Sequence, residues 1–331
     1  MCLLVFGGLL NVGNVFLLFD SPGLLIVLGG VIVLLFIAFP VTDMCEAVGF
    51  VFSGKKELPR AKYLKLTQLY QATGEYSLYC GVWGTCIGFV LILQTMQDPS
   101  TLGPKLAIAF ITILYGMTGK LLSLLALHKL NLCTVTGESY EVKPHKPLAS
   151  FIIGLVLFLL MSIVGILSAG SVISFFDVPS SFIVTGGSIF GVLLFTRGSN
   201  IADAFRGAFS SAEITVEQAQ KSLRVFTQFN DIVVSLMLVG SVAGMLFMLN
   251  TLADPYTIGP KMAMSLLCLF YGIGLSVFIR GLYYIVQRKL SGINEQLDVK
   301  PFFSFNTVTF LSLAVFLLSM ATLILSMMHI E

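Results

Sequence analysis

The sequence predicts an all-α transmembrane fold of nine helices, arranged as two tandem four-helix units followed by one extra helix. The composition, a series of long apolar stretches and an internal repeat all support this prediction. The chain has 331 residues, of which 56% are hydrophobic and only 11% are charged. A soluble domain carries about 25% charged residues. So few charges cannot cover a water-soluble surface, and we expect the chain to lie in a lipid bilayer.

The apolar stretches give the individual helices, because a membrane span needs about 20 mostly apolar residues. The first stretch is the most polar, since glycines and asparagines interrupt it. The predicted spans are residues 1–19, 22–41, 77–97, 103–127, 148–171, 179–196, 231–252, 258–284 and 304–329.

The basic residues predict the orientation, because cytoplasmic connections are enriched in Lys and Arg. The connections 42–76, 128–147, 197–230 and 285–303, with the adjoining helix ends, hold every Lys and Arg except Lys105 and Lys261. We therefore expect these connections and the N-terminus to be cytoplasmic. With nine spans, the C-terminus lies on the periplasmic side.

An internal repeat divides the chain at an offset of about 156 or 157 residues. The stretch FDSPGLLIVLGG at 19–30 returns as FDVPSSFIVTGG at 176–187, and GTCIGFVLILQTMQDPSTLGPKLA at 84–107 returns as GSVAGMLFMLNTLADPYTIGPKMA at 240–263. EVKP at 141–144 returns as DVKP at 298–301, just before the last span. We interpret 1–140 as the first unit, 141–297 as the second unit and 298–331 as an extra transmembrane helix, with both units facing the same way.

The third span of each unit carries small residues at helical spacing, namely Gly84 and Gly88 in the first unit and Gly240 and Gly244 in the second. Small residues let helices approach closely within membranes. Thr85 lies beside this face in the first unit, and Ser241 lies at the same place in the second. The simplest interpretation is tight packing, with each hydroxyl bonded to a carbonyl of its own helix.

The repeated sequence D-P-x-T-x-G-P-K predicts a tight hairpin between the third and fourth spans. Pro99 and Pro255 cannot continue the preceding helix, and Pro104 and Pro260 lie where the next helix begins. A hairpin alone accounts for this backbone chemistry.

The cytoplasmic segments 46–76 and 201–230 alternate charged residues with apolar ones at three-to-four spacing, which predicts short helices. Two interpretations stay open. Each segment is an amphipathic linker on the membrane surface, or it is a surface for a partner protein.

Acidic residues are confined to the predicted span ends: Asp20, Asp98, Asp177 and Asp254 at the outer ends, and Asp43, Glu75 and Asp231 at the inner ends. Carboxylates within the membrane usually mark proton relays, so we expect the chain to have no complete proton path of its own. The six cysteines form no CxxC pair. Catalytic, metal-binding, cofactor-binding and nucleic-acid-binding motifs are not recognised, so we expect no enzyme, no metal and no cofactor.

The order of these motifs resembles the MotA/TolQ/ExbB proton channel family, and MotA most of all. Both units carry F-D-x-P-x-x-x-I-V-x-G-G, and the first unit follows it with G-T-x-x-G, D-P-S-x-x-G-P-x-x-A and T-x-L-Y-G. The resemblance implies a ring-forming channel subunit of a proton- or sodium-driven motor in the bacterial inner membrane. It also implies a MotB/TolR/ExbD-like single-span partner that carries the ion-binding Asp. By the same resemblance, Thr85, Thr112 and Ser241 match ion-pathway positions, and Pro99 and Pro255 match a proline linked to gating.

Three departures from the family pattern shape the expected function. Cys268 stands where the first unit has Thr112, so we expect a complete hydroxyl pair only in the first unit. The cytoplasmic loops are much shorter than in MotA, which favours a non-flagellar role. The tandem fusion favours a ring with an even number of units, or a ring that leaves one unit outside. The alternative function is a non-conducting membrane scaffold derived from the same fold.

Overall fold

The computed structural model describes residues 19–53, 57–94, 102–136, 147–167, 171–210, 214–249 and 255–293. Nearly all of the predicted first span, the whole ninth span, the extra helix 298–331 and Pro99 lie outside these residues. Within them, seven helices are long and apolar enough to cross a membrane, and they coincide with the predicted second to eighth spans. The predicted all-α transmembrane fold is therefore confirmed.

The described part of the first unit begins with a helix built from three consecutive pieces, α2 (Ser21–Leu24), the π-helical turn η2 (Leu25–Gly29) and α3 (Gly30–Ala38). The short α4 (Val41–Phe52) follows, after Pro40. The long α5 (Arg60–Gln94) and α6 (Leu102–Asn131) complete the unit, and the two-stranded parallel sheet of β1 (Glu57–Pro59) and β2 (Thr134–Thr136) joins their ends.

From its second helix onward, the second unit contains helices of the same kinds in the same order as the first, and the strands β1 and β2 have no counterpart among its described residues. It begins with α7 (Pro147–Leu167) and the 3₁₀ turn η4 (Val172–Phe175). A helix with a π-helical turn follows, as α8 (Val178–Ser181), η5 (Phe182–Gly186) and α9 (Gly187–Phe195). The short α10 (Gly198–Phe209), the long α11 (Val216–Leu249) and α12 (Pro255–Ile293) complete it.

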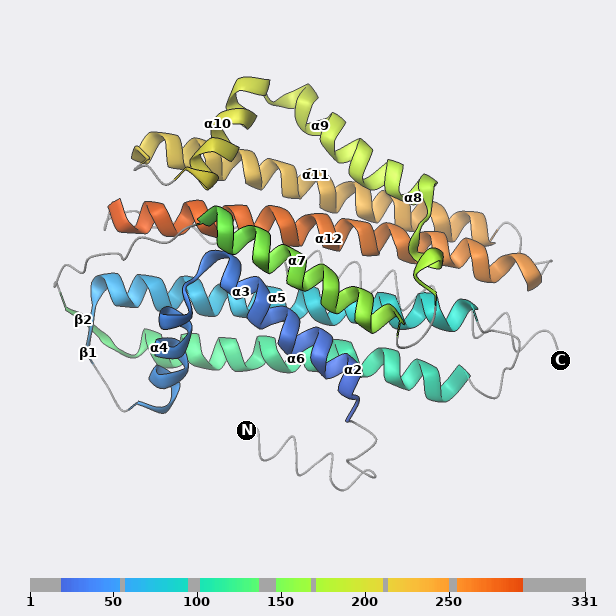
Figure 1. Cartoon of the computed structure of the whole chain (residues 1–331), viewed down its shortest axis with the longest axis horizontal. Coiled ribbons are helices and arrows are strands. Elements are labelled where there is room, and N and C mark those ends of the chain that lie inside the picture. The colour runs from blue at the N-terminus through green and yellow to red at the C-terminus, as the bar shows by residue number, and fades with distance from the viewer. Residues whose placement is uncertain are drawn as a thin grey trace.

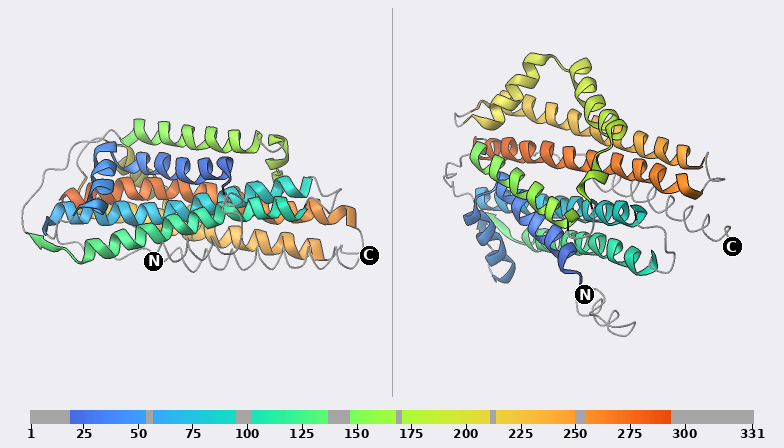
Figure 2. Two further views of the ribbon diagram at one scale, coloured as in Figure 1. Left: turned by 90° about the horizontal axis from the view of Figure 1, so that it is seen from below. Right: turned by 45° about the vertical axis from the view of Figure 1, so that its right-hand side comes forward.

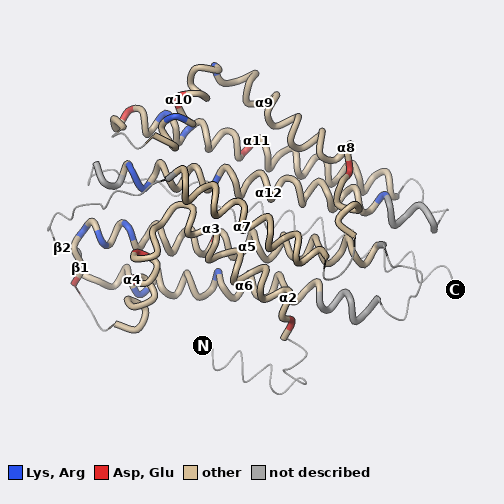
Figure 3. The backbone as a smooth tube through the Cα atoms, viewed as in Figure 1, with Lys and Arg blue, Asp and Glu red and all other residues tan. Residues whose placement is uncertain are grey.

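The four long helices lie side by side in the order α11, α12, α5, α6 (Figure 1). In this row, α12 of the second unit packs directly on α5 of the first. The helices α3 and α7 pack on each other and lie over one side of the row (Figure 2). Lys and Arg gather toward the end of the molecule that carries β1 and β2 (Figure 3).

The segments predicted to be cytoplasmic differ in part from the sequence prediction. Residues 60–76 and 216–230 are not separate helices on a membrane surface, because they continue without a break into the third spans as α5 and α11. With 35 residues and a rise of about 1.5 Å per residue, α5 is far longer than the roughly 30 Å hydrocarbon layer. The three-to-four spacing of apolar residues in these segments is explained by packing on neighbouring long helices.

Candidate functional site

The first unit brings Thr85 and Thr112 together between α5 and α6. Their hydroxyl oxygens lie 2.8 Å apart, and the two residues are only 2% and 4% exposed. Each hydroxyl also contacts a carbonyl of its own helix, Thr85 that of Gly81 at 2.9 Å and Thr112 that of Ala109 at 2.8 Å. The local bonding expected from the sequence is therefore present, together with a contact between the two helices.

These contacts leave the hydroxyl protons of the pair with a choice of acceptor. Two hydroxyls supply two protons, whereas three oxygen–oxygen contacts need one proton each. One contact therefore lacks a donated proton at any time, and the hydroxyls can exchange acceptors by rotating. Such a group presents hydroxyl and carbonyl oxygens, the kinds of ligand that line ion paths through proteins.

The second unit also contains a buried hydroxyl pair, which corrects the expectation of a pair only in the first unit. The Ser241 and Ser265 hydroxyl oxygens lie 3.0 Å apart, and Ser265 donates to the Ser241 carbonyl at 2.7 Å. The sequence comparison placed Cys268 opposite Ser241, but Ser265 lies about one helical turn earlier on α12. The serine at that position was the available signal, since the matching residue of the first unit is Ala109.

Glycines allow the helices to approach closely enough for these pairs. A Cβ added to Gly84 would lie 3.2 Å from the Thr112 Cβ, and one added to Gly88 would lie 2.8 Å from the Ala109 Cβ. The corresponding additions in the second unit would lie 2.8 Å from the Cys268 sulfur at Gly240 and 2.8 Å from the Ser265 backbone at Gly244. All four glycines therefore lie where a larger side chain would push the third and fourth helices apart.

The F-D-x-P motif begins the second helix of each unit and ties it to the fourth. The Asp20 carboxylate accepts from the Gly23 N–H at 2.7 Å, and the Asp20 N–H donates to the Tyr115 hydroxyl at 2.9 Å. Asp177 repeats both contacts, with Ser180 at 2.8 Å and Tyr271 at 3.0 Å. An N-cap side chain of this kind satisfies one of the free N–H groups at a helix start. The two repeated motifs, F-D-x-P and Y-G, are thus halves of one contact.

The predicted hairpin prolines are described only in part. Pro255 is the first residue of α12 and Pro104 is the third of α6. Proline is favoured in a first turn because the missing N–H has no intrahelical partner there. Pro260 was predicted at the start of its helix but is the sixth residue of α12, because this helix begins earlier, at Pro255.

A buried ion pair joins the two units, and no pattern in the sequence predicted it. Glu75 of α5 lies 3.4 Å from the Arg280 guanidinium of α12 and accepts from the Tyr284 hydroxyl at 2.8 Å. Arg280 is only 2% exposed. Glu75 lies within α5 because this helix begins at Arg60, well before the predicted third span. Arg280 lies within α12. A charge buried this deeply requires a partner, so Glu75 and Arg280 fix how the units pack.

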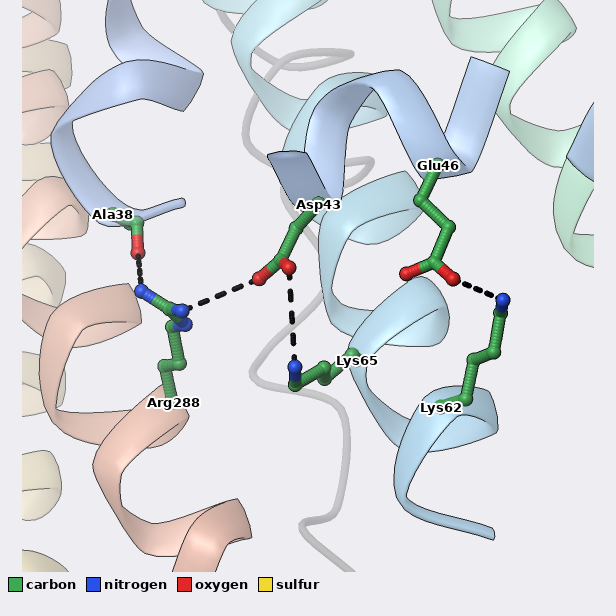
Figure 4. Close-up of polar contacts among 6 residues, drawn as sticks. All are labelled: Ala38, Asp43, Glu46, Lys62, Lys65 and Arg288. Atoms are coloured by element: carbon green, nitrogen blue, oxygen red, sulfur yellow. Dashed lines mark hydrogen bonds and ion pairs between the residues drawn. The ribbon is translucent and has the colours of Figure 1, made fainter. Parts of the chain in front are cut away.

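A second polar contact between the units lies nearer the basic end (Figure 4). The Arg288 guanidinium of α12 donates to the Ala38 carbonyl at 3.3 Å and to the Asp43 carboxylate at 3.2 Å. Asp43 also lies 3.8 Å from the Lys65 ammonium of α5, and Glu46 pairs with Lys62 beside it. This cluster holds α4 and α12 against the start of α5.

The family comparison matches the region that contains α5 and α6. The sequence model of the "MotA/TolQ/ExbB proton channel family" matches residues 55–136. Over 107 residues the chain is 32% identical to "Chemotaxis protein PomA" of Vibrio alginolyticus, which covers 32% of this chain and 41% of PomA.

Two further relatives match over shorter lengths. "Uncharacterized protein YtxD" of Bacillus subtilis (strain 168) is 34% identical over 22% of this chain and 26% of its own length. "Motility protein A" of Aquifex aeolicus (strain VF5) is 43% identical over 17% of this chain and 19% of its own. The matches thus span less than half the length of each of these curated relatives. No solved structure matches the chain.

The family consists of channel-associated proteins rather than enzymes. The seven apolar helices indicate a multi-pass membrane protein. Through residues 55–136, the chain is similar to the MotA/TolQ/ExbB proton channel family.

Proposed function

We propose that the chain is a ring-forming channel subunit of an ion-driven membrane motor, acting with a MotB/TolR/ExbD-like single-span partner that carries the ion-binding Asp. The observation that carries the proposal is the buried Thr85–Thr112 pair, which lies within the region that matches the family. The confinement of Asp and Glu to the predicted span ends fits this arrangement. The hydroxyls of the chain would pass the ion, and the Asp of the partner would bind it.

The second unit supports a working channel over the alternative of a non-conducting scaffold. The apparent loss of a hydroxyl at Cys268 was the reason to consider a scaffold. The Ser241–Ser265 contact at 3.0 Å removes that reason, and we propose that both units contribute to ion flow. The glycines and hairpin prolines would hold and gate the two paths.

We propose a non-flagellar role, with the basic end of the molecule in the cytoplasm. In the first unit, the elements described between the second helix and α5 are the 12-residue α4 and the 3-residue β1. This leaves little surface for contact with a flagellar rotor. Lys and Arg gather at the same end (Figure 3), as cytoplasmic segments do in membrane proteins. The N-terminus would then be cytoplasmic and the C-terminus periplasmic.

Ion flux tests the proposed function. The chain is co-expressed with a single-span protein that has one Asp in its helix and is encoded beside the chain's gene. Proton or sodium entry is followed with an ion-sensitive dye. We expect flux only with both proteins, a large decrease in Thr85→Val, and near-normal flux in the matched control Thr85→Ser, which keeps the hydroxyl. Flux that is unchanged in Thr85→Val would reject the hydroxyl path, and absence of flux with any such partner would favour the scaffold.

A further inference from the structure

The row α11–α12–α5–α6 has the contact between α12 and α5 at its centre. The two helices at its ends, α6 and α11, are the counterparts of α12 and α5 in the other unit. The central contact joins α12, a fourth helix, to α5, a third helix. The row ends at α6, the fourth helix of the first unit, and at α11, the third helix of the second. The two ends are thus of the same types as the two partners in the central contact.

The face of α5 that meets α12 is covered along its length. Trp83 stacks on Phe270 with ring centroids 3.9 Å apart, and its ring also lies against Gly274. About two helical turns before Trp83, the Glu75 carboxylate lies 3.4 Å from the Arg280 guanidinium. The positions of α5 on this face are buried or half-buried: Gln68, Ala72, Glu75, Tyr79, Trp83, Cys86 and Val90.

The same face of α11 is uncovered. Every position 156 residues after the covered positions of α5 is exposed. The face is polar toward the start of α11 and apolar toward its end, as expected for a helix that enters a membrane. These positions, which we call the α11 face, are Arg224, Gln228, Asp231, Ser235, Val239, Val242 and Leu246.

The helix α6 offers the complementary uncovered face. Phe270, Arg280 and Tyr284 of α12 are buried against α5, and the residues 156 positions earlier in α6 are exposed. The positions that form this α6 face are Leu114, Met117, Thr118, Leu124, Leu125 and His128. At the positions that match Glu75, Trp83, Phe270, Arg280 and Tyr284, the two faces therefore correspond to the two sides of the contact between α5 and α12.

Charges alternate across the row and end with opposite signs. Asp231 of α11 interacts electrostatically with Arg280, Arg280 pairs with Glu75, and Glu75 interacts with Lys120 of α6. Within the described residues, no salt bridge within 4 Å involves Asp231 or Lys120. The row thus carries a carboxylate at its α11 end and an ammonium at its α6 end, which is the arrangement that lets copies join end to end.

We propose that the α11 face docks on the α6 face of a second copy of this chain, as α5 docks on α12 within one chain. Asp231 then takes the place of Glu75 and lies opposite Leu124, the counterpart of Arg280, and it pairs with Lys120 of that copy, one turn before Leu124 on α6. The inference rests on the ring assembly proposed above and names its contact. An exposed carboxylate beside the apolar half of α11 is costly against hydrocarbon, whereas the neighbouring Lys120 gives it a partner. The contact is head-to-tail, so each copy binds one neighbour through α11 and another through α6, and the assembly closes as a ring when the rotation from copy to copy completes a full turn.

A cysteine cross-link tests this contact. Within the chain, Trp83 stacks on Phe270, and their counterparts on the free faces are Val239 and Leu114, which are 63% and 39% exposed. The double variant Val239→Cys/Leu114→Cys is oxidised in native membranes. The background replaces the cysteines that are exposed, half-buried or outside the described residues with serine: Cys45, Cys133 and Cys2. We expect a ladder of cross-linked dimers and larger species.

The controls separate this arrangement from chance encounters. Val239→Cys/Leu193→Cys pairs the same residue with an exposed leucine of α9 and is expected to cross-link several-fold less. Equal yields in the two double variants would overturn the proposal. Abundant dimers from Val239→Cys alone would also overturn it, because they would indicate a symmetric contact between two α11 helices.

The charge pair has its own variant. Asp231→Lys, added to the cross-linking pair, places two ammonium groups together and is expected to lower the yield several-fold. The matched control Asp203→Lys changes an exposed carboxylate on α10 and is expected to leave the yield unchanged. Unchanged cross-linking in Asp231→Lys would reject the pairing of Asp231 with Lys120.

The flux measurement tests the channel and the cross-linking tests the docking surface, so either proposal can fail without the other. Cross-linking without partner-dependent flux in the unmodified chain would reject the channel and keep the docking surface. Partner-dependent flux with no more cross-linking than the controls would keep the channel and reject the surface.

Discussion

The helices α5 and α11 occupy matching places in the two units but have different environments. In the apolar part of α5, 83% of the residues are buried, compared with 44% in that of α11. The difference comes mainly from α12, which covers a face of α5, with further contacts from α7 to Trp83. Nothing described covers the same face of α11. The comparison shows that fusing two units in one chain produces one complete contact between units, that of α12 with α5. It also leaves one exposed face on α11 and one on α6.

The residue types on this face also differ between the two helices, and the difference follows the difference in burial. The covered face of α5 has Trp83 and Glu75, each with a partner on α12. At the matching positions the uncovered face of α11 has Val239 and Asp231. If the comparison is right, changes on α5 destabilise the isolated chain, and matching changes on α11 affect only the association of chains.

The largest expected effect is that of Trp83→Ala. Trp83 is 4% exposed, stacks on Phe270 and donates to the Ser162 hydroxyl at 3.1 Å. Removing a buried aromatic side chain costs about 3–5 kcal/mol. We expect this loss of unfolding free energy, measured by SDS titration in mixed micelles. Val239→Ala is the matched change on α11 and is expected to cost less than about 1 kcal/mol. Similar losses would break the comparison.

The next effect is that of Glu75→Gln, which keeps the size of the side chain and removes its charge. Arg280 would remain buried without its carboxylate, which costs about 3 kcal/mol or more. Asp231→Asn removes the matching carboxylate from an exposed position of α11, and we expect less than about 0.5 kcal/mol for it. Thermal unfolding of the purified chain in detergent measures both. A large loss in Asp231→Asn would mean that its contact with Arg280 already stabilises the single chain.

A smaller effect is expected for Gly81→Ala, at the closest approach of α5 and α6. The new Cβ would lie 3.0 Å from the Gly116 Cα and 3.1 Å from the Thr112 carbonyl oxygen. Backbone atoms cannot move aside easily, so we expect a loss of about 1–3 kcal/mol. Gly49→Ala in α4 is the control, because no atom lies within 4 Å of its added Cβ and alanine favours a helix. Its unfolding midpoint is expected to stay the same or rise.

The sequence predicted those parts of the fold that depend on local composition and on repetition. The seven described spans were predicted because each contains a long apolar stretch. The start of the second helix was marked by Asp20 and Asp177. The extension of α5 before the membrane was not predicted, because charged residues at helical spacing fit a surface helix equally well.

The site was predicted in its residue types but not in its contacts. Thr85 and Thr112 were identified through the family resemblance. Ser265 was missed because repeat alignment compares equal positions, whereas the contact shifts by about one turn on α12. The pair of Glu75 and Arg280 was missed because its members belong to different units, and no local pattern records which helices of two repeats will meet.

The smallest expected effect tests whether the two units are equivalent at their outer ends. The Tyr115 hydroxyl accepts from the Asp20 N–H at 2.9 Å, and the Tyr271 hydroxyl accepts from the Asp177 N–H at 3.0 Å. Tyr→Phe at either position removes this acceptor, and a typical hydrogen bond contributes about 1 kcal/mol. We expect similar losses in Tyr115→Phe and Tyr271→Phe, and a double variant whose loss is their sum, because distant sites are additive. The SDS titration used for Trp83→Ala measures all three variants. A much larger loss in Tyr271→Phe would indicate that the contact of Tyr271 with the Phe175 carbonyl holds the outer end of the second unit more firmly. The two units would then be equivalent at their hydroxyl pairs but not at their outer ends.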